Sequence, residues 1–160
     1  MTPTKKDATP LLMAWTKYCV SIRNHFRYEQ IRPMPLKLNP FPVVTDCSGF
    51  VTLVCKLAGL PDPNGLNYNG RGYTGTLLSN KWNKKIPKAQ AQAGDLVVYG
   101  PGTGWHVAMI VEGGPNPLTV SMGQNGDPSY VHVNEDGRMP QTYLRLDRRQ
   151  LLEPTELPKA

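Results

Sequence analysis

The sequence predicts an α+β protein in which N-terminal helices pack on one face of an antiparallel sheet. Two segments with helical spacing of apolar residues lie within the first sixty positions, and short β-branched or apolar runs fill the second half. The 160 residues include 15 glycines and 16 prolines, so turns and loops are frequent. This composition favours a loop-rich α+β fold over a helical bundle.

The first helix is expected over residues 9–28. Thr9 can cap it, Pro10 suits its first turn, and apolar residues recur at helical spacing after them. Residues 31–45 carry four prolines, which forbid a continuous helix and favour an extended segment.

A second helix is expected from Ser48 to Gly59, where glycine and the following Pro61 end it. Residues 61–76 are rich in glycine and asparagine and predict a surface loop. Such a loop either connects two elements or binds substrate.

Five strands should form the sheet as an antiparallel meander. They are expected at 95–99, 106–112, 117–122, 129–133 and 142–146. The length suits one domain with its own core, which we assign to residues 1–147. Residues 148–160 contain two prolines and are expected to form a flexible tail.

The chain is basic, with 18 lysines and arginines against 12 acidic residues and a formal charge of +6. Such a charge draws a protein to polyanions such as nucleic acid or an anionic cell envelope, although a merely soluble basic surface explains it equally well. No dense basic run occurs, and we expect no nucleic-acid partner. We also expect no membrane span, because no stretch approaches the roughly 18 apolar residues that one needs. The N-terminus lacks the apolar core of a signal peptide, which predicts synthesis in a cytoplasm without export by that route.

Cys47 stands at the start of the second predicted helix. Unpaired amides at a helix N-terminus stabilise a thiolate, which is a competent nucleophile. Attack on an amide also needs a proton donor for the leaving amine, and His106, at the start of a predicted strand, is the candidate. Taken singly, a cysteine in apolar surroundings is most often a small buried hydrophobe, and a histidine at a strand edge is most often structural. An odd count of three cysteines argues against a disulfide framework.

Three segments carry a resemblance to a known family. "TDCSGFV" (45–51), "AGDLVVYG" (93–100) and "WHVAMIVEGG" (105–114) occur in the order found in NlpC-type cell-wall cysteine peptidases, a papain-like group related to CHAP domains. The glycine-rich segment 61–76 further resembles that of actinobacteriophage lysins. The resemblance covers about residues 28–122 and implies a papain-like fold with no cofactor.

The resemblance also implies roles for individual residues. Cys47 matches the nucleophile and His106 the base and acid. Tyr28 falls near a family tyrosine that supports the oxyanion region, and the backbone amides of Cys47 and Ser48 are expected to face the oxyanion. Asp46 either holds this loop or caps the helix. In addition, three aromatic residues are expected to contact substrate: Tyr68, Tyr73 and Trp105.

The third catalytic position is where this sequence departs from the family. A polar residue, often histidine, is expected on the strand after His106, and the stretch "LTVSMGQNG" supplies Met122 there. Methionine cannot usefully accept the imidazole N–H. Gln124, Asn125 or a backbone carbonyl can substitute, as amides do in other papain-like sites. We take Gln124 as the candidate. Strand alternation places Thr119 and Ser121 on the face opposite Met122.

The sequence predicts no metal site, because His25 and His132 lack metal-ligand spacing with cysteines or carboxylates. The leading functional hypothesis is a monomeric peptidoglycan endopeptidase of a phage. It would act on the wall after holin-type release from the host cytoplasm or be carried in the virion. Two alternatives stay open: an inactive module that binds the wall or a protein partner, and a Cys–His hydrolase or acyltransferase with a non-wall substrate.

Overall fold

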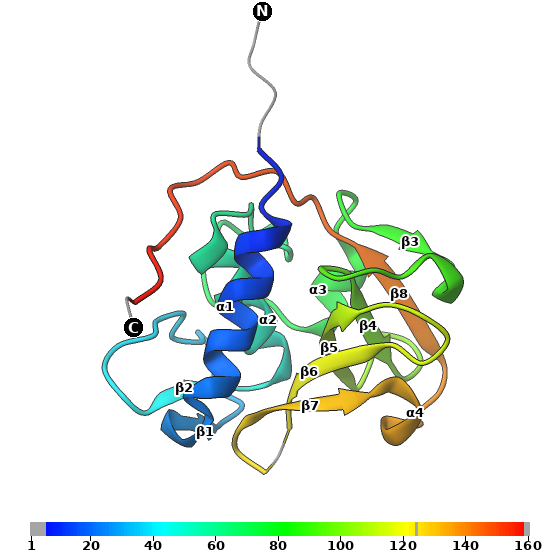
Figure 1. Ribbon diagram of the computed structural model, residues 1–160, viewed down its shortest axis with the longest axis horizontal. Coiled ribbons are helices and arrows are strands. Elements are labelled where there is room, and N and C mark those ends of the chain that lie inside the picture. The colour runs from blue at the N-terminus through cyan, green and yellow to red at the C-terminus, as the bar shows by residue number, and fades with distance from the viewer. Residues whose placement is uncertain (1–5, 124, 159–160) are drawn as a thin grey trace, which may run out of the picture.

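A six-stranded antiparallel sheet forms one side of the molecule, and two helices pack against its inner face (Figure 1). The computed structural model describes residues 6–123 and 125–158. The strand order is β3-β8-β4-β5-β6-β7. These strands are β3 (Lys84–Ile86), β4 (Leu96–Tyr99), β5 (His106–Glu112), β6 (Leu118–Met122), β7 (Pro128–His132) and β8 (Gln141–Arg145). The α+β fold predicted from the sequence is therefore confirmed.

The helices are α1 (Thr9–Ser21), α2 (Cys47–Ala58), α3 (Thr74–Ser79) and α4 (Val133–Asp136), with single 3₁₀ turns at Arg23–His25 and Lys88–Gln90. The first helix is shorter than predicted. Its expected last turns instead form a 3₁₀ turn and the short strand β1 (Phe26–Tyr28), which pairs in parallel with β2 (Val43–Thr45). The pairing of β1 with β2 joins two separate segments of the chain, so the spacing of residues within one segment could not predict it.

The helix α2 begins and ends where local chemistry requires. The Asp46 carboxylate accepts a hydrogen bond of 2.8 Å from the Gly49 N–H and caps the N-terminus. Gly59 ends the helix with φ of 84°, a left-handed conformation that favours glycine. Every residue of α2 except Lys56 is buried, because α1 covers one side of this helix and the sheet covers another.

The sheet differs from a simple meander at its far strands. β4, β5, β6 and β7 pair in sequence as expected, but β8 returns to pair with β4 instead of β7. This arrangement places Leu144 of β8 opposite Leu96 of β4, and both side chains are fully buried. β3 was not predicted, and α3 begins inside the segment that was expected to be loop.

The C-terminal segment packs on the domain, which corrects the expectation of a flexible tail. It runs from β8 over the N-terminal end of α1 and down the side of the helices (Figure 1). The Gly59 carbonyl accepts hydrogen bonds from the N–H groups of residues 151 and 152. The Thr155 carbonyl accepts one from the indole of Trp15, which is buried, and Leu157 packs against the core. The domain therefore includes residues beyond 147.

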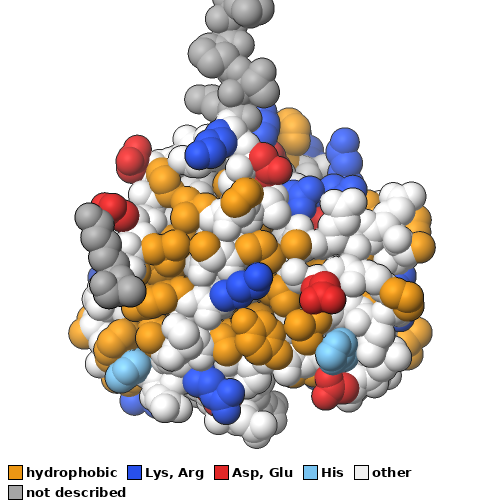
Figure 2. Space-filling view, in the orientation of Figure 1, with side chains coloured by type: hydrophobic (Ala, Val, Ile, Leu, Met, Phe, Trp, Pro, Cys, Tyr) orange, Lys and Arg blue, Asp and Glu red, His pale blue; other side chains and the backbone are white. Residues whose placement is uncertain are grey.

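Basic side chains occupy several separate positions on the face that carries α1, among apolar and uncharged groups (Figure 2). Within the part of the chain that the structure describes, no helix is long and apolar enough to cross a membrane.

Candidate active site

Cys47 is the first residue of α2 and follows directly after β2. Three backbone amides face its sulfur: those of Cys47 itself, Ser48 and Val107. The residue keeps 8% of its surface exposed, whereas Cys19 and Cys55 have none. All three cysteines are free. Cys47 is thus the thiol that a ligand can reach most readily.

The pKa of the Cys47 thiol is raised above its ordinary value. Burial is the largest cause, the Val107 amide acts against it, and the neighbouring Asp46 carboxylate raises the pKa further. The sequence-based expectation of a thiolate stabilised by the helix N-terminus is therefore wrong for the resting protein, since desolvation outweighs the three amides. Cys47 is a neutral thiol at pH 7.

His106 opens β5, and its ring lies among polar and aromatic neighbours. Its Nε2 is 2.5 Å from the Ser121 hydroxyl, and the ring stacks on Tyr99 with centroids 5.8 Å apart. The pKa of His106 is lowered to about 4, first by burial and then by the positive charge of Arg138. The imidazole is therefore neutral at pH 7, and Nδ1 is the ring nitrogen left to act as a base.

The Cys47 sulfur lies next to the first peptide unit of β5, which joins His106 to Val107. The Val107 N–H that faces the Cys47 sulfur belongs to the residue directly after His106. Among the described residues, the side-chain hydrogen bond that His106 makes is the one to Ser121. The bond between nucleophile and base is often long in substrate-free enzymes and tightens when substrate binds.

Ser121 is the residue of β6 that bonds His106, whereas a third catalytic residue was expected at the place of Met122 or at Gln124. The β5–β6 register pairs Met109 with Val120, so Ser121 lies opposite Ala108 on the face of the sheet that carries His106. Met122 points into the core and is fully buried, which corrects its placement at the site. The proposed third residue, Gln124, lies outside the described residues.

Asp46 and Ser48, which are both buried, form a polar network with the partly exposed Arg32. The Arg32 guanidinium is 2.9 Å from the Asp46 carboxylate and donates to the Ser48 hydroxyl at 3.2 Å. Asp46 caps α2, as one of the two roles considered for it predicted. At Gly49, an added Cβ would lie 2.4 Å from the Thr45 hydroxyl, so the Asp-Cys-Ser-Gly turn has room only for glycine. Arg32, in the proline-rich segment, was not anticipated.

Tyr28 lies beside this network. It ends β1 opposite Thr45, and its hydroxyl accepts a hydrogen bond of 3.1 Å from Gln30. Burial raises the pKa of Tyr28, and the nearby Cys47 and Asp46 add to the shift. The hydroxyl is therefore a neutral donor close to the thiol.

Two of the three predicted substrate-binding aromatics lie on neighbouring loops at this end of the molecule. Tyr73 precedes α3, Trp105 precedes His106, and their side chains are 45% and 61% exposed. The Thr74 hydroxyl, 3.4 Å from the Gly104 carbonyl, brings the two loops together.

Tyr68 lies elsewhere. Its hydroxyl donates to the Leu60 carbonyl at 2.6 Å, just beyond the C-terminal end of α2. Cys55 and Asp62 neighbour it there, and burial raises its pKa strongly. Because α2 separates this point from Cys47, Tyr68 supports the loop at 61–76 and does not lie with Tyr73 and Trp105.

Arg138 and Asp136 are charged residues of the site that sequence patterns did not reveal. Two Arg138 nitrogens bond the Asp136 carboxylate at 2.8 and 2.6 Å, and the guanidinium lies 5.6 Å above the Tyr99 ring. Its charge lowers the pKa of His106. Both residues come from the connection between β7 and β8, where no periodic signal was available.

Across residues 6–123 and 125–158, no group of three or more histidine, cysteine or acidic side chains gathers in a geometry that could hold a metal ion.

This α+β fold, with a cysteine opening a helix beside a histidine that opens a strand, is that of the papain-like class. The model of the NlpC/P60 family matches residues 25–146, and the chain belongs to that family. A search of curated sequences finds no significant match.

Solved structures share the fold at low sequence identity. The peptidoglycan hydrolase RipB from Mycobacterium tuberculosis is 20% identical over 95% of this chain and 69% of its own, with a TM-score of 0.53. The P60 domain of an antigen from M. avium paratuberculosis is 21% identical over 87% of this chain and 92% of its own, with a TM-score of 0.56. RipD from M. tuberculosis, described as a non-catalytic NlpC/p60 domain protein adapted to peptidoglycan binding, is 20% identical over 89% and 98%, with a TM-score of 0.53.

Proposed function

We propose that this protein is a peptidoglycan endopeptidase that hydrolyses a stem-peptide amide bond through an acyl-enzyme on Cys47. One observation carries the proposal: the Cys47 sulfur, at the N-terminus of α2, faces the backbone amide of Val107, the residue after His106. The ring of His106 is bonded to the Ser121 hydroxyl. Membership of the NlpC/P60 family and the fold shared with RipB support peptidoglycan as the substrate.

The resting charges define the first chemical step. Both partners are neutral at pH 7, so His106 Nδ1 takes the thiol proton as the sulfur attacks the substrate carbonyl. The Cys47 and Ser48 amides lie at the sulfur and can receive the oxyanion that develops. The imidazolium then protonates the leaving amine, and the C–N bond breaks to leave a thioester.

Water completes the cycle. His106 takes a proton from a water molecule, whose oxygen attacks the thioester carbonyl. The carboxylate product leaves as the proton returns to the sulfur. Ser121 orients the imidazole because its hydroxyl oxygen accepts a hydrogen bond from Nε2–H throughout, and this neutral hydroxyl stabilises the imidazolium less than a carboxylate would.

The setting in which the enzyme would work is part of the same proposal. The glycine-rich segment 61–76 resembles that of actinobacteriophage lysins, and a monomeric phage enzyme would reach the wall after holin-type release or from the virion. The net charge of +6 would favour its approach to an anionic wall.

A second candidate is a module of the same fold that binds peptidoglycan without cleaving it. Three observations favour this candidate: Cys47 is only slightly exposed, its pKa is raised, and the residue that bonds His106 is the neutral Ser121. RipD, which shares the fold, is described as non-catalytic.

Mass spectrometry of fragments released from purified peptidoglycan separates these candidates. The wild-type protein should release fragments with one new amine and one new carboxylate at a stem-peptide amide. Cys47→Ala should release none, and Cys55→Ala, a change at a fully buried thiol, is the matched control. Binding without fragments from the wild-type protein would favour the inactive module.

A further inference from the structure

Two adjoining cavities form a groove far from Cys47. They measure about 480 and 350 Å³, each within the range of about 300–1,000 Å³ that small-molecule sites occupy. Four residues line both cavities, so the two are continuous: Trp82, Leu146, Asp147 and Arg149. We call this continuous surface the Trp82 groove.

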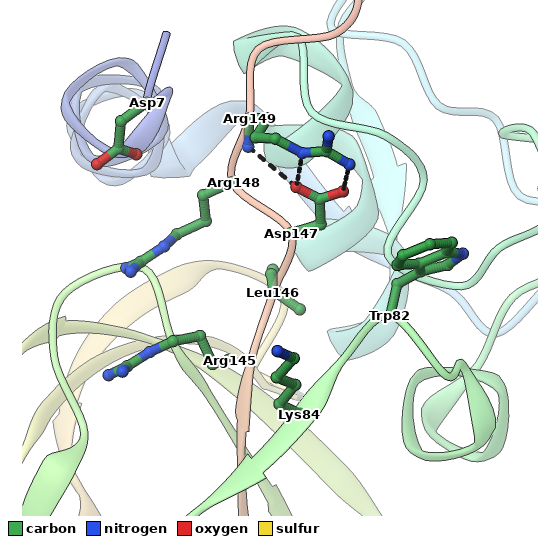
Figure 3. Close-up of a pocket in the computed structure, with 8 residues that line it drawn as sticks. All are labelled: Asp7, Trp82, Lys84, Arg145, Leu146, Asp147, Arg148 and Arg149. Carbon is green, nitrogen blue, oxygen red and sulfur yellow. Dashed lines mark hydrogen bonds and ion pairs between the residues drawn. The ribbon is translucent and has the colours of Figure 1, made fainter. Parts of the chain in front are cut away.

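Trp82 is the aromatic centre of the groove. Its side chain is 61% exposed, although an indole of this size is normally covered. The Lys81 ammonium lies 5.5 Å from the ring centroid and supports one face of it. Figure 3 shows the indole on the same side of the 145–149 segment as Asp147 and Arg149, whereas Arg145 and Arg148 extend to the other side.

The charges that line the groove are largely neutralised by one another. Arg149 binds Asp147 through two bonds of 2.9 and 2.7 Å (Figure 3). Arg145 binds the buried Asp95 through two bonds of 3.1 and 2.9 Å. Lys84 and Arg148 are balanced by two acidic lining residues, Asp7 and Asp62, so the lining keeps almost no net charge. This balance fits a neutral polar ligand better than a polyanion.

Fixed amides extend the polar lining into the second cavity. The Asn80 and Asn83 side chains both donate to the Pro63 carbonyl, at 2.9 and 2.8 Å, so the two amides are held in place before any ligand binds. Asn67 lines the same cavity. Held amides and paired charges offer hydrogen bonds to hydroxyl groups without much loss of side-chain entropy.

We propose that the Trp82 groove binds a neutral saccharide chain, with a sugar ring stacked on Trp82 and its hydroxyls bonded to the Asp147–Arg149 pair and the amides. An aromatic platform with fixed polar groups beside it is the chemistry that recognises sugar rings. The inference deepens the proposed function, on which its choice of ligand rests: the saccharide would be the glycan strand that carries the stem peptides.

The groove and the thiol lie at opposite ends of α2. Pro61 and Pro63 of the groove follow the C-terminal end of this helix, whereas Cys47 begins it. Twelve helical residues span about 17 Å. A polymer can therefore occupy the groove without covering Cys47, and attachment at two sites strengthens binding to one chain.

Calorimetric titration with the soluble tetramer of N-acetylglucosamine tests this site without any cleavage. We expect the wild-type protein to bind it, Trp82→Ala to bind at least about tenfold more weakly, and Trp82→Tyr to keep most of the affinity. Tyr130→Ala is the matched control, because Tyr130 is also an exposed aromatic, at 47%, but lies on β7 and lines neither cavity. The affinity should change little between low and high salt, as expected for a neutral ligand.

Three results would overturn the proposal: no binding by the wild-type protein, loss of binding in Tyr130→Ala but not in Trp82→Ala, or tighter binding of an anionic polymer such as polyphosphate with steep salt dependence. Because no bond is cleaved in this titration, its failure leaves the hydrolysis test unaffected. A failure of hydrolysis likewise leaves saccharide binding measurable.

Discussion

Side chains from three different elements set the position and the pKa of the His106 imidazole. Ser121 of β6 bonds Nε2, Tyr99 of β4 stacks on the ring, and the Arg138 charge from the loop before β8 lowers its pKa. The neutral ring that results is a base ready to accept a proton, and its neutral partner Ser121 makes the imidazolium a stronger acid. At this scale, the chemistry depends on desolvation more than on a preformed ion pair.

The hydroxyl of Ser121 should matter for turnover. Ser121→Ala leaves Nε2 of a buried ring without its partner, so we expect kcat to fall about tenfold or more with little change in KM. Ser121→Asp should raise the pKa of His106 and shift the acid limb of the pH–rate profile upward. Thr119→Val, a change on the same face of β6, is the control. Unchanged kcat in Ser121→Ala would remove Ser121 from the site.

The lowered pKa of His106 predicts a loss of stability in acid. The unfolded chain binds a proton at this histidine below about pH 6.5, whereas the folded chain does so only near pH 4. The free energy of unfolding should therefore fall as the pH drops from 6.5 to 4, by up to about 3 kcal/mol. Urea unfolding at several pH values measures the slope.

His106→Asn should flatten this slope, because it removes the group whose pKa differs between the folded and unfolded chains. An equal slope in wild type and His106→Asn would show that the folded protein accepts the proton freely.

At the scale of elements, the N-terminus of α2 is built from interactions that reach across the chain. Asp46 caps the helix and binds Arg32, which also donates to the Gly72 carbonyl at 3.0 Å. One side chain therefore ties the proline-rich segment and the loop before α3 to the turn that presents Cys47. Local sequence patterns indicated the cap, but they did not reveal the arginine.

Variants of Asp46 separate the cap from the ion pair. Asp46→Asn keeps a capping oxygen and loses the charge, whereas Asp46→Ala loses both. We expect Asp46→Ala to lower the free energy of unfolding by about 2–4 kcal/mol, and Asp46→Asn to cost about 1 kcal/mol less than that. Thermal and urea unfolding give both values. Equal losses in the two variants would mean that the cap contributes nothing.

The third catalytic position shows why predicting the strands did not predict the residue that bonds His106. Alternation along residues 118–122 correctly separated Ser121 from Met122, but it could not tell which of the two faces carries His106. That choice depends on the β5–β6 register, which shifts at an irregularity between Ile110 and Glu112. A one-residue shift of register exchanges the two faces of a strand.

At the scale of the whole molecule, the fold class and the positions of Cys47 and His106 followed from sequence, because a helix cap and strand alternation are local signals. The pairing of β8 with β4 and the docking of the C-terminal segment depend on contacts between distant residues. Neither feature produces a periodic pattern or a motif spacing in the amino-acid sequence. The Arg138–Asp136 pair could not be predicted for the same reason, since it lies near His106 because β8 pairs with β4.

Docking of the C-terminal segment predicts a measurable contribution to stability. Removal of residues 148–160 would expose the buried Trp15 indole and leave the Gly59 and Leu57 carbonyls without their partners. We expect the free energy of unfolding to fall by more than about 3 kcal/mol. Equal melting temperatures for wild type and the longer truncation would show that the segment does not stabilise the domain.

The central claim is that Cys47 forms a covalent bond to the acyl half of a cleaved stem peptide. Rapid acid quenching followed by intact-protein mass spectrometry tests it most directly. The predicted result is a transient adduct with the mass of that acyl group, mapped to the peptide that contains Cys47 and absent from Cys47→Ala. Peptide release by Cys47→Ala at the wild-type rate, with no adduct at any time, would contradict the claim.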